Sequence, residues 1–180
     1  MNTIEQPMTA SLVGTEGSGS PANFSARRQA FRTLHEAGCF VIPNPWDVGS
    51  ARYLQHLGFP ALATTSAGFA FSQGLPDSEV ALSCDRNRNL TYIADIAAAV
   101  DVPVNADFAS GYGRAPRDVA DNVTRCIATG VAGLSIEDAT GDLRRPIYDF
   151  ALAVERVHAA AEVARSLPIP FMLTARAENF

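Results

Sequence analysis

Three oxygen-bearing side chains lie where two short apolar segments end, and together they are able to hold a divalent cation. Asn105 and Asp107 stand two residues apart, so on a strand their side chains point to the same side. Glu137 ends the next apolar segment. Oxygen ligands without histidine or cysteine suit Mg²⁺ or Mn²⁺. We predict a metal site of Asp107, Asn105 and Glu137; the alternative for each acid is a helix cap or a loop hydrogen bond.

A guanidinium and a further carboxylate complete the predicted catalytic set. Arg176 ends the last apolar segment, and an arginine beside acids can clamp a substrate carboxylate through two parallel hydrogen bonds. The alternative is a structural ion pair with Glu137 or Asp107. Asp77 follows Leu-Pro in a loop, where it either closes over the site or caps a turn or helix. We therefore take Asp77, Arg176 and Glu137 as candidate catalytic residues.

A run of small residues offers backbone N–H groups to a substrate. Ser66, Ala67 and Gly68 follow the apolar segment Ala61–Thr65. Successive N–H groups in such a turn can hold an oxyanion. We predict that these three residues, together with Arg176, bind the substrate.

Composition excludes several other kinds of chemistry. All 14 basic residues are arginine, so the chain has no lysine for a Schiff base, a P-loop or pyridoxal phosphate. The three histidines lie in helix-like segments and the three cysteines lack CxxC spacing, so we expect no zinc site and buried thiols in a reducing cytoplasm. The net charge of −5, the scattered arginines and the absence of a bilayer-length apolar run argue against nucleic acid and a membrane as partners.

Short apolar segments that alternate with helical patterns must position these residues. Strands that are apolar on both faces suit a buried parallel sheet. The predicted strands are Cys39–Pro43, Ala61–Thr65, Val102–Ala106, Gly133–Ile136 and Phe171–Thr174. The predicted helices are Ala22–Ala37, Val48–Leu57, Arg86–Ala99, Pro116 to about Gly130, and Phe150–Ser166. In the last helix we expect Asp149 as the cap and Val154, Val157 and Ala161 on the inner face.

The alternation predicts an α/β fold with a parallel sheet and right-handed crossovers. An open doubly wound sheet and part of a (β/α)₈ barrel both fit, and polar residues gathered after the strand ends are typical of the functional face of a barrel. The dinucleotide fold lacks its G-x-G-x-x-G signature. Residues 1–21, with much Gly, Ser and Thr, are expected to be a disordered leader, and residues 22–180 the catalytic domain.

Motifs at these strand ends resemble, in order, those of the isocitrate lyase/phosphoenolpyruvate mutase superfamily, over about residues 31–180. They are Asn44–Asp47, Thr64–Gly68, Gly74–Asp77, Val104–Asp107 with Gly111–Gly113, Leu134–Asp138 and Thr174–Glu178. The resemblance implies a TIM-type (β/α)₈ barrel, a Mg²⁺ cofactor, a small 2-oxo acid substrate and an enolate intermediate.

The same resemblance implies a role for each candidate residue. Asp107 and Asn105 would hold Mg²⁺, with Glu137 and Asp77 nearby, and Arg176 would neutralise enolate or carboxylate charge. The backbone amides of residues 66–68 would hold the substrate carboxylate. The full-length protein would be a homo-oligomer, a tetramer by resemblance.

Three departures from the family pattern narrow the expected function. Asn105 stands where the family usually has Asp, which removes one negative charge from the metal site. The segment Ala139–Pro146 lacks the Lys-Lys-Cys-Gly-His loop of the isocitrate and methylisocitrate lyases, which favours the mutase-like branch. The chain holds about five of eight expected strands, so we expect a barrel truncated after about the fifth.

The leading interpretation is a Mg²⁺-dependent lyase that cleaves a carbon–carbon bond of a small 2-oxo or 2-hydroxy dicarboxylate, such as an oxaloacetate-like acid. A phosphonomutase that rearranges a phosphorus–carbon bond through the same enolate is one alternative. A truncated, non-catalytic remnant or interaction module is another, and a stand-alone five-stranded flavodoxin-like domain is the third.

Overall fold

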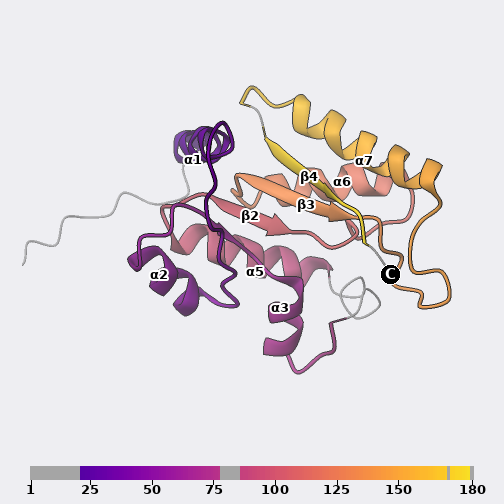
Figure 1. Cartoon of the computed structure of the whole chain (residues 1–180), viewed down its shortest axis with the longest axis horizontal. Coiled ribbons are helices and arrows are strands. Elements are labelled where there is room, and N and C mark those ends of the chain that lie inside the picture. The colour runs from indigo at the N-terminus through magenta and orange to yellow at the C-terminus, as the bar shows by residue number, and fades with distance from the viewer. Residues whose placement is uncertain (1–20, 78–85, 170, 179–180) are drawn as a thin grey trace, which may run out of the picture.

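The computed structural model describes residues 21–77, 86–169 and 171–178, in which helices pack against a twisted parallel sheet (Figure 1). The strands are β1 (Leu62–Ala63), β2 (Val104–Asp107), β3 (Gly133–Glu137) and β4 (Met172–Arg176). The helices are α1 (Pro21–Leu34), α2 (Val48–His56), α3 (Ser66–Ser72), α5 (Arg86–Ala99), α6 (Pro116–Ile127) and α7 (Phe150–Arg165). The leader expected at residues 1–21 lies, except for its last residue, outside the described residues.

The strands follow one another across the sheet in chain order, and each neighbouring pair is parallel. This confirms the expected α/β fold with a parallel sheet. A flavodoxin-like sheet places its first strand between the second and the third. Here β1 and β2 pair directly, Leu62 opposite Val104, so no strand lies between them. The flavodoxin-like alternative is therefore wrong.

One face of the sheet is covered by α2, α5, α6 and α7. Val104 and Ala106 of β2 and Leu134 and Ile136 of β3 are at most 1% exposed and belong to one apolar cluster. Each of the four helices contributes to the same cluster, among them Ala51, Ile93, Val123 and Ala160. Because side chains alternate along a strand, the polar residues of β2 must lie on the opposite face.

Helix α1 packs near the N-terminal ends of the strands through Phe31, which is 2% exposed and clusters with Ala61 and Ala132. Gly133 at the start of β3 makes this approach possible. A Cβ atom there would lie 2.8 Å from Phe31 Cε1 and 2.8 Å from the Met172 carbonyl oxygen. Any larger residue at Gly133 would therefore displace either α1 or β4.

The predicted strand Cys39–Pro43 is not a strand in the structure. The segment runs beside β1, where Ala63 N–H donates to the Pro43 carbonyl at 3.0 Å. Neither Pro43 nor Pro45 has an N–H group to continue a ladder. The neighbouring bond comes instead from the Asn44 side-chain amide, which donates to the Ala63 carbonyl at 3.0 Å.

The structure has a helix, α3, where the sequence predicts a turn at Ser66–Gly68. Thr65 takes the N-cap position of this helix, and its hydroxyl accepts from Gly68 N–H at 3.1 Å. The seven-residue helix follows β1 almost at once, so β1 spans two residues instead of the predicted five. Thr64 N–H still bonds to the Asn105 carbonyl at 2.9 Å and keeps the chain in the sheet.

For α7 the expected capping bond is wrong, and the expected inner face is confirmed only in part. Asp149 stands at the N-cap position but makes no capping bond, and its carboxylate lies 3.5 Å from Arg145 instead. The buried residues of the helix are Arg156, Ala160 and Ala164, and Val157 packs against the core as expected, whereas Val154 is 50% exposed. This alanine-rich helix buries an arginine, and a hydrophobic pattern alone does not place an arginine on the inner face.

The cysteines differ from one another in environment. Cys126 on α6 is buried, which raises the pKa of its thiol, whereas Cys39 is exposed because its segment is not an inner strand. Cys84 lies outside the described residues. Among the helices that the structure describes, none is both long enough and apolar enough to cross a membrane.

Candidate functional site

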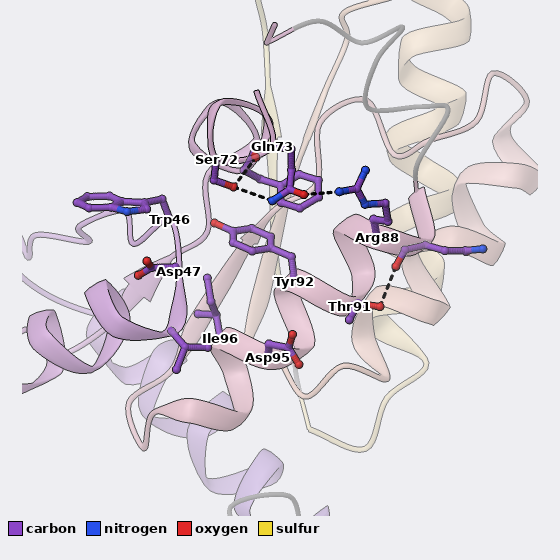
Figure 2. A pocket seen from close by; sticks show the side chains of 12 residues that line it. Trp46, Asp47, Ser72, Gln73, Arg88, Thr91, Tyr92, Asp95 and Ile96 are labelled. Atoms are coloured by element: carbon purple, nitrogen blue, oxygen red, sulfur yellow. Dashed lines mark hydrogen bonds between the residues drawn. The ribbon is translucent and has the colours of Figure 1, made fainter. Parts of the chain in front are cut away.

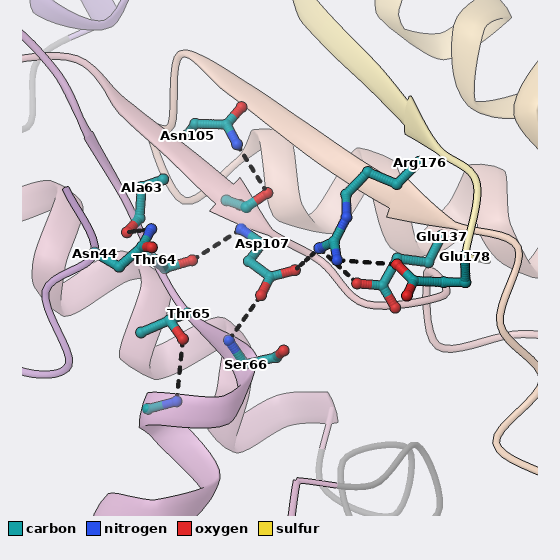
Figure 3. A network of polar contacts seen from close by, with 12 residues as sticks. Asn44, Ala63, Thr64, Thr65, Ser66, Asn105, Asp107, Glu137, Arg176 and Glu178 are labelled. Atoms are coloured by element: carbon teal, nitrogen blue, oxygen red, sulfur yellow. Dashed lines mark hydrogen bonds and ion pairs between the residues drawn. The ribbon is translucent and has the colours of Figure 1, made fainter. Parts of the chain in front are cut away.

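Arg176 lies among three carboxylates at the C-terminal ends of β2, β3 and β4 (Figure 3). Its guanidinium is 2.6 Å from Glu137, 3.4 Å from Asp107 and 2.9 Å from Glu178. The Glu137 and Asp107 side chains are only 13% and 17% exposed, and Arg176 is 43% exposed. The predicted convergence of Asp107, Glu137 and Arg176 therefore exists, and one side of the arginine faces solvent.

Asp107 is held from its backbone and from its side chain. Its N–H donates to the Thr64 hydroxyl at 3.0 Å. One carboxylate oxygen accepts from Ser66 N–H at 2.9 Å, and the other faces Arg176. Sheet register supports this arrangement, because the end of β2 lies beside the loop that leaves β1.

The end of β4 is fixed to the residues that follow β3. Glu137 and Arg176 are register partners on β3 and β4. Asp138 N–H donates to the Arg176 carbonyl at 3.3 Å, and the Asp138 carboxylate accepts from Glu178 N–H at 2.8 Å. Asp138 therefore holds the backbone on both sides of residue 177, so Arg176 reaches the acids from an anchored strand end.

The predicted substrate-binding run forms the first turn of α3. Ser66 N–H is bonded to Asp107, and Gly68 N–H is bonded to the Thr65 hydroxyl. Gly68 also lies close to other residues, since a Cβ atom there would be 3.1 Å from Trp46 Cβ. The run does lie beside the cluster, through Ser66, and its binding role stays a prediction.

Asn105 lies two residues before Asp107 on β2, so the two side chains lie on the same face of the strand. Its amide nitrogen lies 3.5 Å from the Ala106 carbonyl, and its amide oxygen would be 2.8 Å from a Cβ atom at Gly133. Figure 3 shows its amide set apart from the guanidinium of Arg176. The described contacts do not connect Asn105 with the carboxylates, and its role as a metal ligand stays a prediction.

Asp77 lies within electrostatic reach of the cluster although its surface is exposed. The pKa of its carboxyl is raised, first by partial desolvation and then by the Asp107 carboxylate, while Arg176 opposes the rise. A loop acid with no connection to the site would not respond to either charge. The chain after Asp77, residues 78–85, lies outside the described residues.

The donor chemistry of this cluster fits a divalent cation. Asp77, Asp107, Glu137 and Glu178 supply only oxygen, and they outnumber the single guanidinium of Arg176. Excess negative charge and oxygen donors are what Mg²⁺ requires. Among the described residues, no group of three His, Cys, Asp or Glu side chains is close enough to share one metal ion. Arg176 occupies the space between Asp107 and Glu137, so an ion would share these carboxylates with it.

Three residues near the site were not identified as functional from the sequence. Thr64 and Asp138 anchor Asp107 and the end of β4, as described above. Tyr92 of α5 donates its hydroxyl to the Pro45 carbonyl at 3.0 Å, and desolvation raises its pKa to about 12. Nothing in the sequence indicates Tyr92, because it is one aromatic residue in a helix and its loop partner is 47 residues distant.

A cavity lined by described residues lies beside the cluster and not at it. It has a volume of about 600 Å³ and is lined by residues of the segment before α2 and of α3 and α5. Figure 2 shows Trp46 and Tyr92 along its wall, with Asp47 and Asp95 at its edge. Arg88 is bonded there to Gln73. Neither Asp107 nor Arg176 lines this cavity, so the chemistry is assigned to the open cluster of strand ends.

Fold and site together define the class of protein. A parallel α/β sheet that gathers acids and an arginine at the C-terminal ends of its strands is typical of enzymes with small anionic substrates. The sequence model of the phosphoenolpyruvate phosphomutase family matches residues 31–180, and the chain belongs to that family. This confirms the resemblance to the isocitrate lyase/phosphoenolpyruvate mutase superfamily.

Individual relatives agree with this family. An uncharacterized protein of Mycobacterium tuberculosis (strain H37Rv) is 36% identical over 129 residues, which are 71% of this chain and 46% of that protein. The crystal structure of a candidate lyase/mutase from Burkholderia cenocepacia J2315 has a TM-score of 0.83 and 50% identity, covering 88% and 55% of the two chains. That of oxaloacetate acetylhydrolase has a TM-score of 0.73 and 32% identity, covering 84% and 53%. The chain thus spans about half the length of these relatives.

Proposed function

We propose that this chain carries the active site of a Mg²⁺-dependent carbon–carbon lyase for a small 2-oxo or 2-hydroxy dicarboxylate, such as an oxaloacetate-like acid. The observation that carries the proposal is the guanidinium of Arg176 held 2.6 Å from Glu137 and 3.4 Å from Asp107 at the strand ends. The family supports it, and so does the similarity to oxaloacetate acetylhydrolase.

Arg176 is proposed to stabilise the charge that forms as the bond breaks. Cleavage leaves an electron pair on the carbon beside the carbonyl, and the charge moves onto the carbonyl oxygen as an enolate. A positive group fixed in advance stabilises this charge without reorganisation during the reaction. Glu137, Asp107 and Glu178 fix the guanidinium, and its solvent-facing side is the part that we propose to meet a substrate carboxylate or the enolate oxygen.

Asp107 and Glu137, with Asn105 as a further donor, are the residues that we propose to hold Mg²⁺. A bound Mg²⁺ would supply a Lewis acid that polarises the substrate carbonyl. Asp107 already accepts from Ser66 N–H, which orients its carboxylate. The first turn of α3 is the proposed place of the substrate carboxylate, by resemblance to the family.

Asp77 is the candidate for proton transfer. Its raised pKa brings the carboxyl nearer to neutral pH than an ordinary aspartate. It lies in the segment that follows α3, where the charges of Asp107 and Arg176 act on its carboxyl. We infer that Asp77 exchanges a proton with the substrate, whereas Asp107 and Glu137 hold the guanidinium of Arg176 in place.

We also infer that this sheet is part of a (β/α)₈ barrel. Its strands follow chain order, and four helices cover one face. In a (β/α)₈ barrel the same arrangement of strands inside and helices outside continues until the sheet closes. Relatives of about twice the length leave room for the remaining strands. A homo-oligomer is proposed by resemblance to the family.

The test compares two substrates with and without metal. We expect oxaloacetate to lose its distal carboxylate as CO₂ and to release pyruvate after protonation of the enolate, with loss of that activity in EDTA and recovery with Mg²⁺ or Mn²⁺. Turnover of phosphonopyruvate instead of oxaloacetate would establish the phosphonomutase alternative. Absence of Mg²⁺ binding by calorimetry, with no difference between the native chain and Asp107→Ala, would establish the non-catalytic alternative.

A further inference from the structure

Arg156 of α7 is a charged side chain with 1% exposure that the proposed chemistry does not use. Its guanidinium donates to the carbonyl oxygens of Ser110, Gly113 and Arg114, the last at 2.9 Å. All three acceptors belong to the loop 108–114, which directly follows Asp107. A buried guanidinium with its donors on one loop fixes that loop, because moving it would leave buried N–H groups unbonded.

The loop 108–114 has a backbone that needs such support. Ala109 and Tyr112 have positive φ angles of 46° and 55°, which L side chains rarely adopt. Gly111, with φ of 81°, lies so close to the sheet that a Cβ atom there would be 3.0 Å from Ile136 Cδ1. A loop with this conformation keeps it only when neighbouring groups hold it in place.

The loop in turn is bonded to the backbone of β3 and continues from Asp107, so it adjoins both residues whose carboxylates form the site. Its first residue, Phe108, continues from Asp107 and donates N–H to the Ser135 carbonyl at 3.2 Å. The Ala109 carbonyl accepts the N–H of Glu137 at 2.9 Å. The positions of Asp107 and Glu137 therefore depend on the path of the loop between Phe108 and Arg114.

Arg156 also contacts the segment that follows β3. Its guanidinium carbon lies 3.9 Å from the centre of the Tyr148 ring, a cation–π contact. Tyr148 N–H donates to the Asp138 carbonyl at 2.9 Å. One guanidinium thus joins the loop after β2 to the segment after β3, on either side of the acid pair.

The geometry points to Arg156 as a positioning residue that sets the places of Asp107 and Glu137 through the loop 108–114. The effect of Arg156 on metal and substrate binding rests on the proposed function. The link from Arg156 to the Glu137 backbone rests only on the described contacts. Arg156 contacts neither carboxylate in the described contacts and acts through the backbone. Its removal should therefore loosen the site without changing any residue that meets the substrate.

Arg156→Met in the 180-residue chain tests this role, and Arg27→Met is a matched control. Arg27 is also an arginine on a helix, 3% exposed, and it donates to the Ala97 carbonyl at the far end of α5. Hydrogen exchange of the Glu137 amide is measured relative to that of Val123 in α6. Calorimetry measures the dissociation constant for Mg²⁺. Arg156→Lys is the second variant, should Arg156→Met not fold.

We expect both arginine variants to melt at lower temperature, but only Arg156→Met to speed exchange of the Glu137 amide relative to Val123. The dissociation constant for Mg²⁺ should rise by about 10–100-fold in Arg156→Met and stay unchanged in Arg27→Met. Arg156→Lys keeps the charge but not the three-carbonyl fork, and should show the same pattern more weakly.

Equal relative exchange in the Arg156 and Arg27 variants would overturn the positioning role and leave Arg156 as a core residue. If the native chain binds no Mg²⁺, the proposed function fails by itself, and the exchange of the Glu137 amide still decides the role of Arg156. Millimolar guanidinium added to Arg156→Ala should slow exchange at Glu137 again, which a general loss of packing would not allow.

Discussion

Arg176 has more charged neighbours than any other described residue of the strand ends, and its contribution can be measured directly. Replacing it by methionine keeps much of the aliphatic stem but leaves Asp107 and Glu137 without the cation between them. We expect kcat/KM for oxaloacetate to fall by about 10²–10³-fold, as for loss of one transition-state donor. Steady-state kinetics of Arg176→Met measures this.

Arg144→Met is the control for that substitution. Arg144 also pairs with an acid, Asp142 at 3.5 Å, but its side chain is 92% exposed and lies in the segment between β3 and α7. An exposed pair of this kind contributes little. If the two variants lost activity equally, Arg176 would have no special place in the reaction.

The raised pKa of Asp77 predicts that the stability of the folded chain depends on pH. Its pKa in the folded chain is raised above the ordinary value of 3.8, so folding favours the protonated form. The chain therefore gains stability from this group at low pH and loses it as the pH rises through the raised pKa. Asp77→Asn should melt at higher temperature than the native chain at pH 7.

The difference should vanish below pH 3.8, where both the folded and the unfolded chain hold the proton. Thermal unfolding of both proteins at several pH values gives the comparison. A lower melting temperature for Asp77→Asn at pH 7 would mean that Asp77 is paired favourably and does not face the Asp107 charge.

Sequence alone could predict that Asp107, Glu137 and Arg176 meet, because parallel strands bring their C-terminal ends to one edge. It could not predict which groups hold them. The side chains of Thr64 and Asp138 each accept one hydrogen bond from a backbone N–H group, and such bonds leave no pattern in the sequence. Asn105 shares a face with Asp107, as expected. Its distance from Arg176 could not be predicted, because it depends on how far β2 and β4 each extend.

At the scale of the elements, Asp47 is the clearest case of one side chain that starts a helix. Its carboxylate accepts from Ser50 N–H at 2.6 Å, and the Ser50 hydroxyl accepts from Asp47 N–H at 3.1 Å, a capping box for α2. Asp47→Ala should lower the free energy of unfolding by about 0.5–2 kcal/mol at pH 7. Urea unfolding measures the change.

Hydrogen bonds from Ser50 lower the pKa of Asp47, so its stabilisation is present above the ordinary value of 3.8 and is lost as the pH falls through the lowered pKa. The cost of Asp47→Ala should therefore shrink in acid. Asp149→Ala is the control, since Asp149 holds the N-cap position of α7 without a capping bond. Equal costs for the two variants would contradict the capping account.

The elements that the sequence predicts well have a regular spacing of apolar residues or a residue such as proline or glycine that marks where a helix begins or ends. In α6, Val119, Val123 and Ile127 repeat every four residues behind Pro116, and all three are buried. The residues of α3 gave no such signal, because seven residues are too few to show a helical period. For α7 the buried face includes Arg156, which a hydrophobic pattern cannot select.

At the scale of the whole molecule, the sheet is covered unevenly. In β3 the first four residues are buried, whereas the last three residues of β4 are exposed. Among the described residues, β4 pairs with β3 on one side and with no strand on the other. A parallel sheet is normally buried on both faces and at its edges. The exposed end of β4 therefore presents backbone N–H and C=O groups and side chains that another chain could cover.

An apolar groove of about 470 Å³ lies between α7 and the end of β4, and it should make the 180-residue chain self-associate. Phe150 and Val154, which line it, are 85% and 50% exposed, and such patches drive association. Sedimentation velocity should show a mass that rises with concentration, and Phe150→Glu/Val154→Glu should sediment as a monomer. Tyr53→Glu, on the exposed surface of α2, should leave association unchanged. Association that survives the double substitution would place the contact on another face, because two carboxylates cannot be buried unpaired in an apolar interface.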